Sequence, residues 1–272
     1  FQTALPARGE DSVAMLQALQ EEAEEMAAAW TGPRPNRIPV VPEKLSFADF
    51  ERRINDSDLV GADFIPLGLD FEKVLPLGIS LEKFQHLLYV SDDEESMHII
   101  SSHLINIFKN IVFNTSVMLI DSNLNYKEFK DSVATYVCVE EKIKDMGNQL
   151  MFELDKRITS KSDKNWFIII PDLESFLEVC DITREQMVRL YKVGWKYGLF
   201  LIVGSTHQYI GSTINNIAKD IRKDLQWVLL GMRLNDQNFL SKVYNSKEVR
   251  LEPDEAYLHS RKDSQKIKIS WG

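Results

Sequence analysis

Short apolar runs alternate with helical patterns from residue 84 onward, and this alternation restricts the fold more than any other feature of the sequence. The expected strands span 84–90, 116–120, 166–170, 199–203 and 226–230, and the expected helices span 97–110, 139–156, 173–179, 184–197 and 214–221. Apolar strands without polar alternation, separated by helices, are typical of a parallel sheet buried between two helical layers. The sequence therefore predicts an α/β fold with a central, mainly parallel sheet and helices on both faces.

The segments that flank this core add smaller elements. Apolar residues recur at helical spacing from 10 to 30, and the proline-rich stretch 31–45 is typical of a linker. The other expected elements are a helix at 46–54, two strands at 64–71 and 74–79, and a closing hairpin at 255–259 and 266–270. We therefore divide the chain into 1–45, an appended helix and linker, and 46–272, the α/β module.

Composition and charge exclude several classes of protein. The chain has 272 residues, of which 44% are hydrophobic, and this is enough for a large core. Its 41 acidic and 32 basic residues give a net charge of −9, whereas a nucleic-acid-binding domain usually has a basic face, so we expect no nucleic-acid partner. Cys138 and Cys180 are expected to be reduced core residues, and the five histidines show no spacing that predicts a metal site. No apolar run approaches the ~20 residues that span a bilayer.

The most informative loop lies between the first core strand and the first core helix. This is the setting of the motif GxxxxGK[ST], whose glycines, lysine and hydroxyl hold the phosphates and magnesium of a nucleotide. The residues at those four positions are Ser91, Ser96, Met97 and His98. The positions between the two serines include four carboxylates, Asp92, Asp93, Glu94 and Glu95, which would repel phosphate. One interpretation is a phosphate-binding loop that has kept the spacing of the motif and lost its chemistry. The alternative is an ordinary strand–loop–helix that never bound phosphate.

A second apolar run ends where magnesium would be held in a nucleotide-hydrolysing site. In the segment WFIIIPDLESF, 166–176, the first of the two usual acid positions holds Pro171 and the second holds Asp172. Proline offers no carboxylate, so the magnesium anchor is missing. Asp172 is also placed to cap a helix that begins at residue 173, and this alternative stays open.

A third apolar run, LFLIVGSTHQ at 199–208, ends in Ser205 and Thr206. A RecA-like motor has a polar residue at this position that senses the terminal phosphate of the nucleotide. The two hydroxyls fit that role, and they also fit an ordinary polar loop at the end of a strand.

These segments together resemble the FtsK/SpoIIIE-type ATPases, which have a RecA-like P-loop NTPase fold. More narrowly, the chain is similar to the C-terminal, third ATPase-like module of the EssC/YukB family of coupling proteins in the type VII secretion system. The segments that carry the resemblance are 64–96, 166–176, 199–208, VLLGMRLNDQNFL at 228–240 and EPDEAYLHS at 252–260. The resemblance covers essentially the whole chain, and FQTALP at 1–6 is similar to the last strand of a preceding module.

The resemblance implies a motor at the cytoplasmic face of the bacterial cell membrane, anchored through upstream transmembrane helices, that exports small WXG-type proteins. It places the phosphate-binding loop at 91–98, the two acids at Pro171 and Asp172, and the sensor at Ser205 and Thr206. Because the sequence departs from the functional residues at most of these positions, we expect no catalysis and no bound ATP, magnesium or other cofactor in this module.

We therefore expect a non-catalytic module that recognises exported WXG-type substrates, regulates the adjoining ATPase modules, or does both. The resemblance implies a hexamer for the full-length protein, and we expect a monomer for the isolated module. Two alternatives stay open: a weak ATP-binding or ATP-hydrolysing motor domain, and a structural spacer in a hexameric ring.

Overall fold

The structure is a computed structural model that describes residues 9–32, 38–57, 63–112, 115–160, 164–240, 248–261 and 263–272. The chain forms two compact units, Phe1–Pro39 and Val40–Gly272. The strand predicted at 1–6 lies outside the described residues.

The first unit contains helix α1, Ser12–Ala29, which lies within the predicted span 10–30. The Asp11 carboxylate begins the helix by accepting hydrogen bonds from the backbone N–H groups of Val13 and Ala14, at 3.0 and 2.8 Å. No residue of α1 is buried within the structure described.

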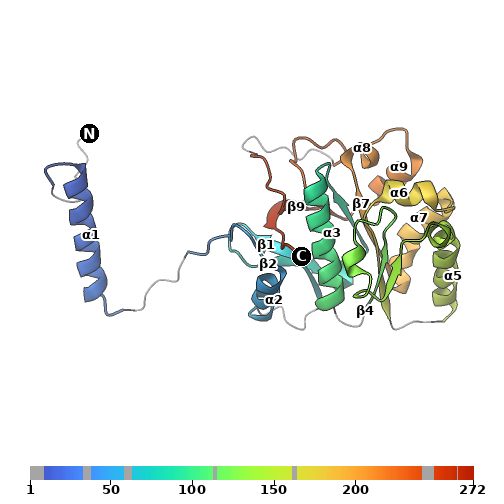
Figure 1. Cartoon of the computed structure of the whole chain (residues 1–272), viewed down its shortest axis with the longest axis horizontal. Helices are drawn as coiled ribbons and strands as arrows, with labels where there is room; N and C mark the ends of the chain where they lie inside the picture. The colour runs from blue at the N-terminus through green and yellow to red at the C-terminus, as the bar shows by residue number, and fades with distance from the viewer. Residues whose placement is uncertain are drawn as a thin grey trace. The chain divides into compact units, whose positions relative to one another are not determined.

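Figure 1 shows the second unit with its central sheet. The described strands of this sheet are in the order β2-β1-β10-β9-β8-β3-β7-β6-β4-β5. The strands are β1 Phe64–Asp70, β2 Pro76–Ser80, β3 His86–Val90, β4 Thr115–Ile120, β5 Thr135–Val137, β6 Asn165–Ile170, β7 Leu199–Ser205, β8 Trp227–Leu230, β9 Glu255–Ser260 and β10 Ser264–Lys268. Strands β5, β4, β6, β7, β3 and β8 pair in parallel, and β9, β10, β1 and β2 extend the sheet with antiparallel pairs. The mainly parallel sheet is confirmed.

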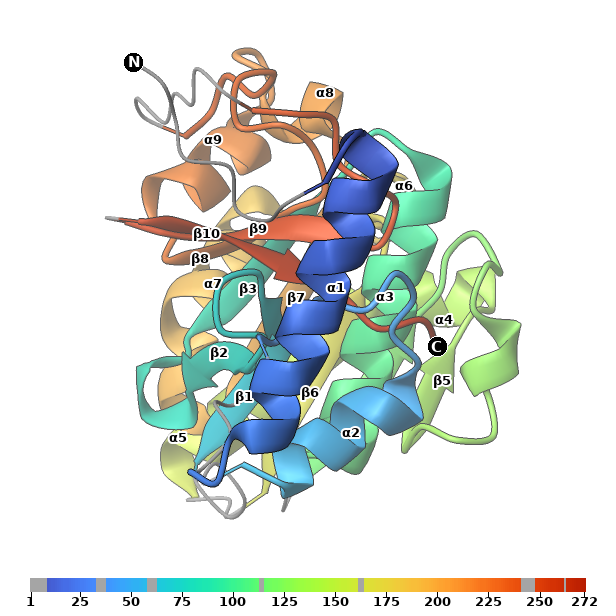
Figure 2. The same cartoon turned by 90° about the vertical axis from the view of Figure 1, so that its left-hand side faces the viewer.

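Helices cover both faces of this sheet, as Figure 2 shows for α3 on one side of the strands and α7 and α9 on the other. The helices are α2 Phe47–Asn55, α3 Glu94–Asn110, α4 Glu140–Lys144, α5 Met146–Thr159, α6 Leu173–Val179, α7 Arg184–Val193, α8 His207–Ile210 and α9 Asn216–Lys223. Side chains of α2 and α3 belong to one buried core, and those of α4 to α9 belong to a second.

Strand β3 shows how the sheet divides these two cores. Successive side chains of a strand point to opposite faces. Leu87 and Tyr89 accordingly belong to the core beneath α2 and α3, whereas Leu88 and Val90 belong to the core beneath the other helices. Because β3 is buried on both faces, four of its five residues are apolar and follow one another without polar alternation, and this signal predicted a central strand.

The prediction of one long helix at 139–156 is wrong, because the structure has two helices, α4 and α5, that meet at Asp145. The carbonyl oxygen of Lys144 accepts a hydrogen bond from the backbone N–H of Asp181, at 3.0 Å. A neighbouring loop thus supplies the donor that a continuous helix would have supplied from its next turn. This contact is between residues far apart in sequence, so helical spacing does not reveal it.

Other differences concern the ends of elements and one missed strand. Helix α3 begins three residues before the predicted residue 97, and the helix predicted at 184–197 ends at Val193 and continues as a 3₁₀ turn, Gly194–Tyr197. The segment predicted as a helix at 214–221 is α9, which begins at Asn216. Strand β5 was not predicted because it has three residues and pairs with β4 only at Met118–Ile120.

A stacked group of phenylalanines at the centre of the first core yields a prediction about stability. The Phe167 ring is fully buried and lies 4.4 Å from the Phe108 ring and 5.0 Å from the Phe200 ring, centroid to centroid. We expect Phe167→Ala to lower the free energy of unfolding in urea by about 3–5 kcal/mol, because it leaves a cavity. The control is Phe152→Ala on α5, whose side chain is 73% exposed. It should change stability by less than about 0.5 kcal/mol, and an equal loss in both variants would contradict the prediction.

Candidate functional site

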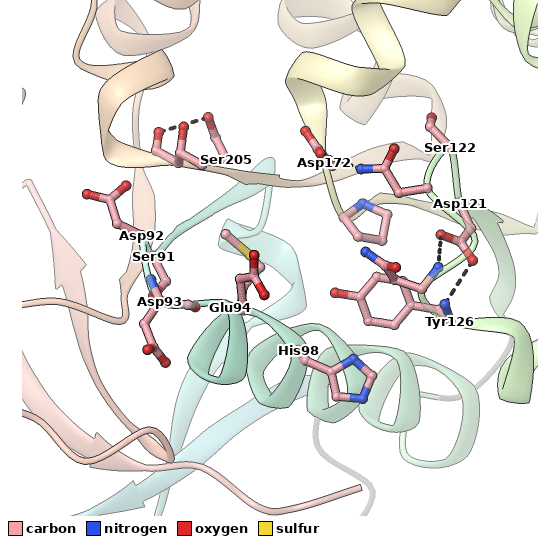
Figure 3. A pocket seen from close by; sticks show the side chains of 15 residues that line it. Ser91, Asp92, Asp93, Glu94, His98, Asp121, Ser122, Tyr126, Asp172 and Ser205 are labelled. Carbon is pink, nitrogen blue, oxygen red and sulfur yellow. Dashed lines mark hydrogen bonds between the residues drawn. The ribbon is translucent and has the colours of Figure 1, made fainter.

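A cleft of about 550 Å³ lies at the carboxyl ends of β3, β4, β6 and β7 (Figure 3). Its lining comprises Ser91, Asp92, Asp93, Glu94, Met97, His98, Asp121, Ser122, Asn123, Asn125, Tyr126, Pro171, Asp172, Ser205 and Thr206. The carboxyl edge is where ligands bind in open α/β sheets. The cleft is therefore the candidate functional site of the module.

The structure brings the residues predicted for the site together. Six of the eight residues in the loop 91–98 line the cleft, together with Pro171, Asp172, Ser205 and Thr206. Ser96 is buried outside the lining, and Glu95 is exposed outside it. Three of the four loop carboxylates, and not all four as predicted, therefore face the space where phosphates would lie.

Ser91 fixes the loop to the ends of two neighbouring strands. Its backbone N–H donates to the carbonyl oxygen of Ser205 at 3.3 Å, and its hydroxyl donates to the carbonyl oxygen of Gly231 at 3.2 Å. The same hydroxyl accepts a hydrogen bond from the backbone N–H of Asp93 at 3.1 Å. The loop is thus held in place by the protein itself.

Asp93 occupies the amino end of α3. One of its carboxylate oxygens accepts hydrogen bonds from the backbone N–H and from the hydroxyl of Ser96, both at 2.8 Å. These bonds lower the pKa of Asp93. The amino end of a helix is also a position at which proteins bind phosphate. In this chain the carboxylate of Asp93 supplies the negative charge there.

Asp92 joins the loop after β3 to the loop after β7. Its carboxylate accepts a hydrogen bond from the backbone N–H of His207 at 2.7 Å and lies 3.7 Å from Nδ1 of the same histidine. The other ring nitrogen of His207 lies 3.0 Å from the Asn238 side-chain oxygen. Asp92 is thus part of a connection that runs over three loops at the edge of the sheet.

Asp172 is a helix cap, which was one of the two alternatives left open by the sequence. Its carboxylate accepts hydrogen bonds from the backbone N–H of Ser175 at 3.1 Å and from the Ser175 hydroxyl at 2.6 Å. The side-chain amide of Asn123, in the segment after the neighbouring strand β4, donates a third bond at 2.7 Å. Three of the roughly four acceptor positions of the carboxylate are thus in use.

The two hydroxyls predicted as a sensor also have partners within the protein. The Thr206 hydroxyl caps α8 by accepting a hydrogen bond from the backbone N–H of Tyr209 at 3.2 Å. The Ser205 hydroxyl donates to the carbonyl oxygen of Thr206 at 3.1 Å, and Ser205 is buried. Both hydroxyls stabilise the loop after β7.

The segment after β4, which was not predicted to be part of the site, supplies Asp121, Ser122, Asn123, Asn125 and Tyr126 to the cleft. The Asp121 side chain is buried and accepts hydrogen bonds from the backbone N–H groups of Asn125 and Tyr126 and from the Tyr136 hydroxyl, at 3.0, 2.9 and 2.7 Å. Burial, followed by the bond to Asp121, raises the pKa of Tyr136. Asp121 follows an apolar run directly, and this signal was available from the sequence.

Tyr126 forms a wall of the cleft beside α3. Its ring stacks on the ring of His98 with centroids 5.2 Å apart and planes inclined by 11°. Burial raises the pKa of Tyr126 to about 12, so its hydroxyl is neutral at physiological pH. His98 also lies 3.8 Å from the Glu128 carboxylate, with both side chains about half exposed.

The charge of the cleft is negative. Five of its lining residues carry a carboxyl group, Asp92, Asp93, Glu94, Asp121 and Asp172, and its lining as described holds no lysine or arginine. Across the described ranges, no group of three or more His, Cys, Asp and Glu side chains is arranged to hold a metal ion. In the same ranges, no helix combines the length and the apolar character that crossing a bilayer requires.

Comparisons with known proteins relate this chain to the type VII secretion proteins EssC and EccC. No protein-family model matches the chain. EssC of Staphylococcus aureus strain NCTC 8325 is 22% identical over 272 residues, which cover 98% of this chain and 18% of EssC. The chain therefore spans less than a fifth of the length of that relative.

Two solved structures have the same fold. The structure of EssC ATPases 2 and 3 from Geobacillus thermodenitrificans matches 98% of this chain and 52% of that chain, with a TM-score of 0.77 and 20% identity. The structure of Thermomonospora curvata EccC ATPases 2 and 3 in complex with a signal sequence peptide matches 97% and 50%, with a TM-score of 0.69 and 15% identity. The predicted RecA-like P-loop fold and the resemblance to this group of secretion proteins are confirmed.

The Asp93 cap predicts a pH-dependent loss of stability. At pH 7, we expect Asp93→Ala to lower the free energy of unfolding by about 1 kcal/mol, whereas Asp93→Asn keeps a capping oxygen and loses less. Because the folded state lowers the pKa of Asp93, its contribution is complete above the ordinary carboxyl value of 3.8 and is lost as the pH falls through the lowered value. The difference between wild type and Asp93→Ala should therefore shrink in acid.

Urea unfolding at pH 7 and in acid measures this effect, and Glu95→Ala is the matched control. Glu95 is in the same helical turn, is exposed and does not line the cleft. A loss for Glu95→Ala as large as that for Asp93→Ala would show that charge near the helix end, and not the cap, is responsible.

Proposed function

We propose that this chain, on its similarity to EssC and EccC over nearly its whole length, is a non-catalytic ATPase module of a type VII secretion motor. Its role is to recognise exported WXG-type proteins, to regulate the adjoining ATPase modules of the same protein, or both. The observation that carries the proposal is the occupation of the phosphate-binding position at α3 by the Asp93 carboxylate.

The hydrogen bonds and charges of the cleft disfavour a nucleotide. To bind at the amino end of α3, a phosphate group has to displace Asp93 from the Ser96 backbone N–H, and Asp92 and Glu94 also line this part of the cleft. Two like charges at ~4 Å repel by about 1 kcal/mol in bulk water and by several times that near a protein surface. Met97 is at the position of the lysine of the motif, and among the described residues that line the cleft there is no lysine or arginine to replace it.

The donor set does not fit a nucleotide-bound magnesium ion. Mg²⁺ in such sites is held by one or two carboxylates together with phosphate oxygens and waters. Pro171 has no carboxylate. The Asp172 carboxylate accepts three hydrogen bonds from the protein, and the Asp121 carboxylate also accepts three. Binding of the ion through these two residues would break bonds that cap α6 and order the loop after β4.

Recognition of a partner is supported by the fold and by one related structure. Thermomonospora curvata EccC, which has this fold, was solved in complex with a signal sequence peptide. A scaffold without nucleotide chemistry keeps its helix faces and grooves, and such surfaces bind peptides in many proteins. We infer that the full-length protein forms a hexamer at the cytoplasmic face of the bacterial membrane, and that this module binds no nucleic acid.

The volume of the cleft, unlike its charge, supports a second candidate function, which is weak binding of ATP. Its volume of about 550 Å³ lies within the range of small-molecule sites, about 300–1,000 Å³. Stacking of the base on an aromatic side chain would then have to offset the repulsion from the carboxylates. The third candidate, a structural spacer, requires neither ATP nor substrate to bind.

Calorimetric titration separates these functions. We expect the wild-type chain to give no heat with ATP and Mg²⁺ and to bind a purified WXG-type protein. A dissociation constant for ATP of about 10 μM or tighter would contradict the proposal and would require turnover to be measured. Binding of neither molecule would leave the spacer, which is then tested by deleting the module from the full-length protein and measuring substrate capture.

A rebuilt loop tests whether the carboxylates exclude the nucleotide. We expect binding of ATP to appear in a variant that carries glycine at 92–95 together with Met97→Lys and His98→Thr, because it regains the lysine and the hydroxyl of the motif. Circular dichroism must first show that this variant is folded, since it lacks the α3 cap. No gain in affinity would indicate that the cleft excludes ATP by its shape and not by its charge.

A further inference from the structure

The acidic residues of the cleft lack the cationic partners that acidic residues have elsewhere in the chain. Asp220, for example, pairs with Arg184 at 2.7 Å. None of the lysine or arginine ion pairs among the described residues includes a carboxylate that lines the cleft. Asp92 has a histidine partner, His207, at 3.7 Å. The described chain thus concentrates negative charge in the cleft without a lysine or arginine to balance it.

Glu94 is the acid of the cleft with the most unused bonding capacity. Its side chain extends from the start of α3 into the cleft (Figure 3), and no described residue forms a hydrogen bond or an ion pair with its carboxylate. By contrast, Asp93 accepts two hydrogen bonds from the chain, and Asp121 and Asp172 accept three each. Within the described chain, both carboxylate oxygens of Glu94 are therefore available to a ligand.

Two hydroxyl groups in the wall of the cleft add acceptors for a ligand that donates hydrogen bonds. Tyr126 is only 4% exposed, and its hydroxyl points into the cleft (Figure 3). The Ser122 hydroxyl also belongs to the lining, and its oxygen is buried without a hydrogen-bond partner among the described residues. A buried hydroxyl that has no partner in the protein is uncommon, and it favours a ligand or a water at this wall.

The negative charge extends to the rim of the cleft on α6. The pKa of Glu174 is raised, first by desolvation and then by the charges of Asp172 and Glu178. Hydrogen bonds at the start of α3 lower the pKa of Asp93 most, and the charge of Arg250 lowers it further, although Arg250 does not line the cleft. A cation that a partner brings into the cleft would reduce the repulsion between these carboxylates.

A guanidinium group matches these acceptors better than an ammonium group does. Glu94 is on α3, whereas Ser122 and Tyr126 are in the segment after β4, so the acceptors come from separate elements. A guanidinium has five N–H donors that point in several directions in one plane, whereas an ammonium has three donors on one atom. The volume of about 550 Å³ also leaves room for the aliphatic part of an arginine and for the chain that carries it.

We propose that the cleft binds the guanidinium group of an arginine that a partner protein presents. Glu94 is its main carboxylate, and the hydroxyls of Tyr126 and Ser122 are further acceptors. This inference goes beyond the proposed function, because it gives the cleft a ligand of its own. Complementary charges of this kind speed association and select the partner.

Three probes and three variants of the full chain test the inference. The probes are the tripeptide acetyl-Gly-Arg-Gly-amide, the same peptide with uncharged citrulline in place of arginine, and spermidine as a free polyamine. The variants are Glu94→Gln, Tyr126→Phe and the matched control Glu95→Gln. Glu95 is the next residue of the same helix, is exposed and does not line the cleft. Binding is followed by NMR from the backbone N–H signals of residues 121–126, and thermal unfolding checks that each variant is folded.

We expect the arginine peptide to bind with a dissociation constant of about 1 mM or tighter, and the citrulline peptide to bind about tenfold more weakly. Glu94→Gln should weaken binding of the arginine peptide by about fivefold and Tyr126→Phe by about threefold, because each removes an acceptor. Glu95→Gln should leave the affinity within about twofold of wild type, because its side chain lies outside the cleft.

Three results would contradict the inference. Equal affinities of the arginine and citrulline peptides would overturn recognition of a cation. Equal losses in Glu94→Gln and Glu95→Gln would overturn the cleft as the site, because they would indicate attraction to the acidic surface as a whole. Binding of spermidine about tenfold more tightly than the arginine peptide would overturn a protein as the source of the cation.

Discussion

Backbone N–H groups at the carboxyl edge of a parallel sheet need acceptors, because each following helix begins with donors that have no partner within the helix. In this protein, carboxylates of the chain supply them. Asp93 caps α3, Asp172 caps α6, and Asp92 accepts from the first residue of α8. Beyond β8, the Glu248 carboxylate accepts from the backbone N–H groups of Leu234 and Asn235. The bonds of Asp92, Asp93 and Asp172 order loops that line the cleft.

The same edge shows how closely two neighbouring loops fit together. A side chain at Gly204 in β7 would begin 2.1 Å from the carbonyl oxygen of Pro171 and 2.7 Å from the ring of Tyr89. Glycine is therefore required at this position for the loops after β6 and β7 to approach each other. The proline at 171 thus stands in a tightly packed site, even though it offers no side-chain group to a ligand.

The antiparallel half of the sheet is joined to the parallel half through β8 and β9. A buried ion pair secures it, because the Lys268 ammonium lies 2.7 Å from the Asp254 carboxylate and the Trp271 indole N–H donates to the other oxygen at 2.8 Å. Removing one member of such a pair leaves a buried charge without a partner, which commonly costs about 3–5 kcal/mol. The sequence predicted the hairpin but gave no sign that Asp254 and Lys268 meet.

The fold was predictable because its central strands are buried on both faces and therefore consist mainly of apolar residues, as β3, β6 and β7 do. The site was predictable where a strand ends in polar residues, as at Ser91, Asp172 and Ser205. The break at Asp145 and the contribution of Asn123 were not predictable, because each depends on a hydrogen bond to a residue that is remote in sequence. The exposure of Phe152 was not predictable either, because the way in which the whole of α5 lies on the sheet decides which of its apolar residues are exposed.

Loops that are held by carboxylates of the same chain differ from loops that a bound ligand has to order. The acceptors at α3 and α8 are covalently attached to the backbone they order, so their effective concentration is fixed by geometry. The conformation of this edge is consequently set by the chain itself, and no bound ligand is needed to order the starts of α3 and α8.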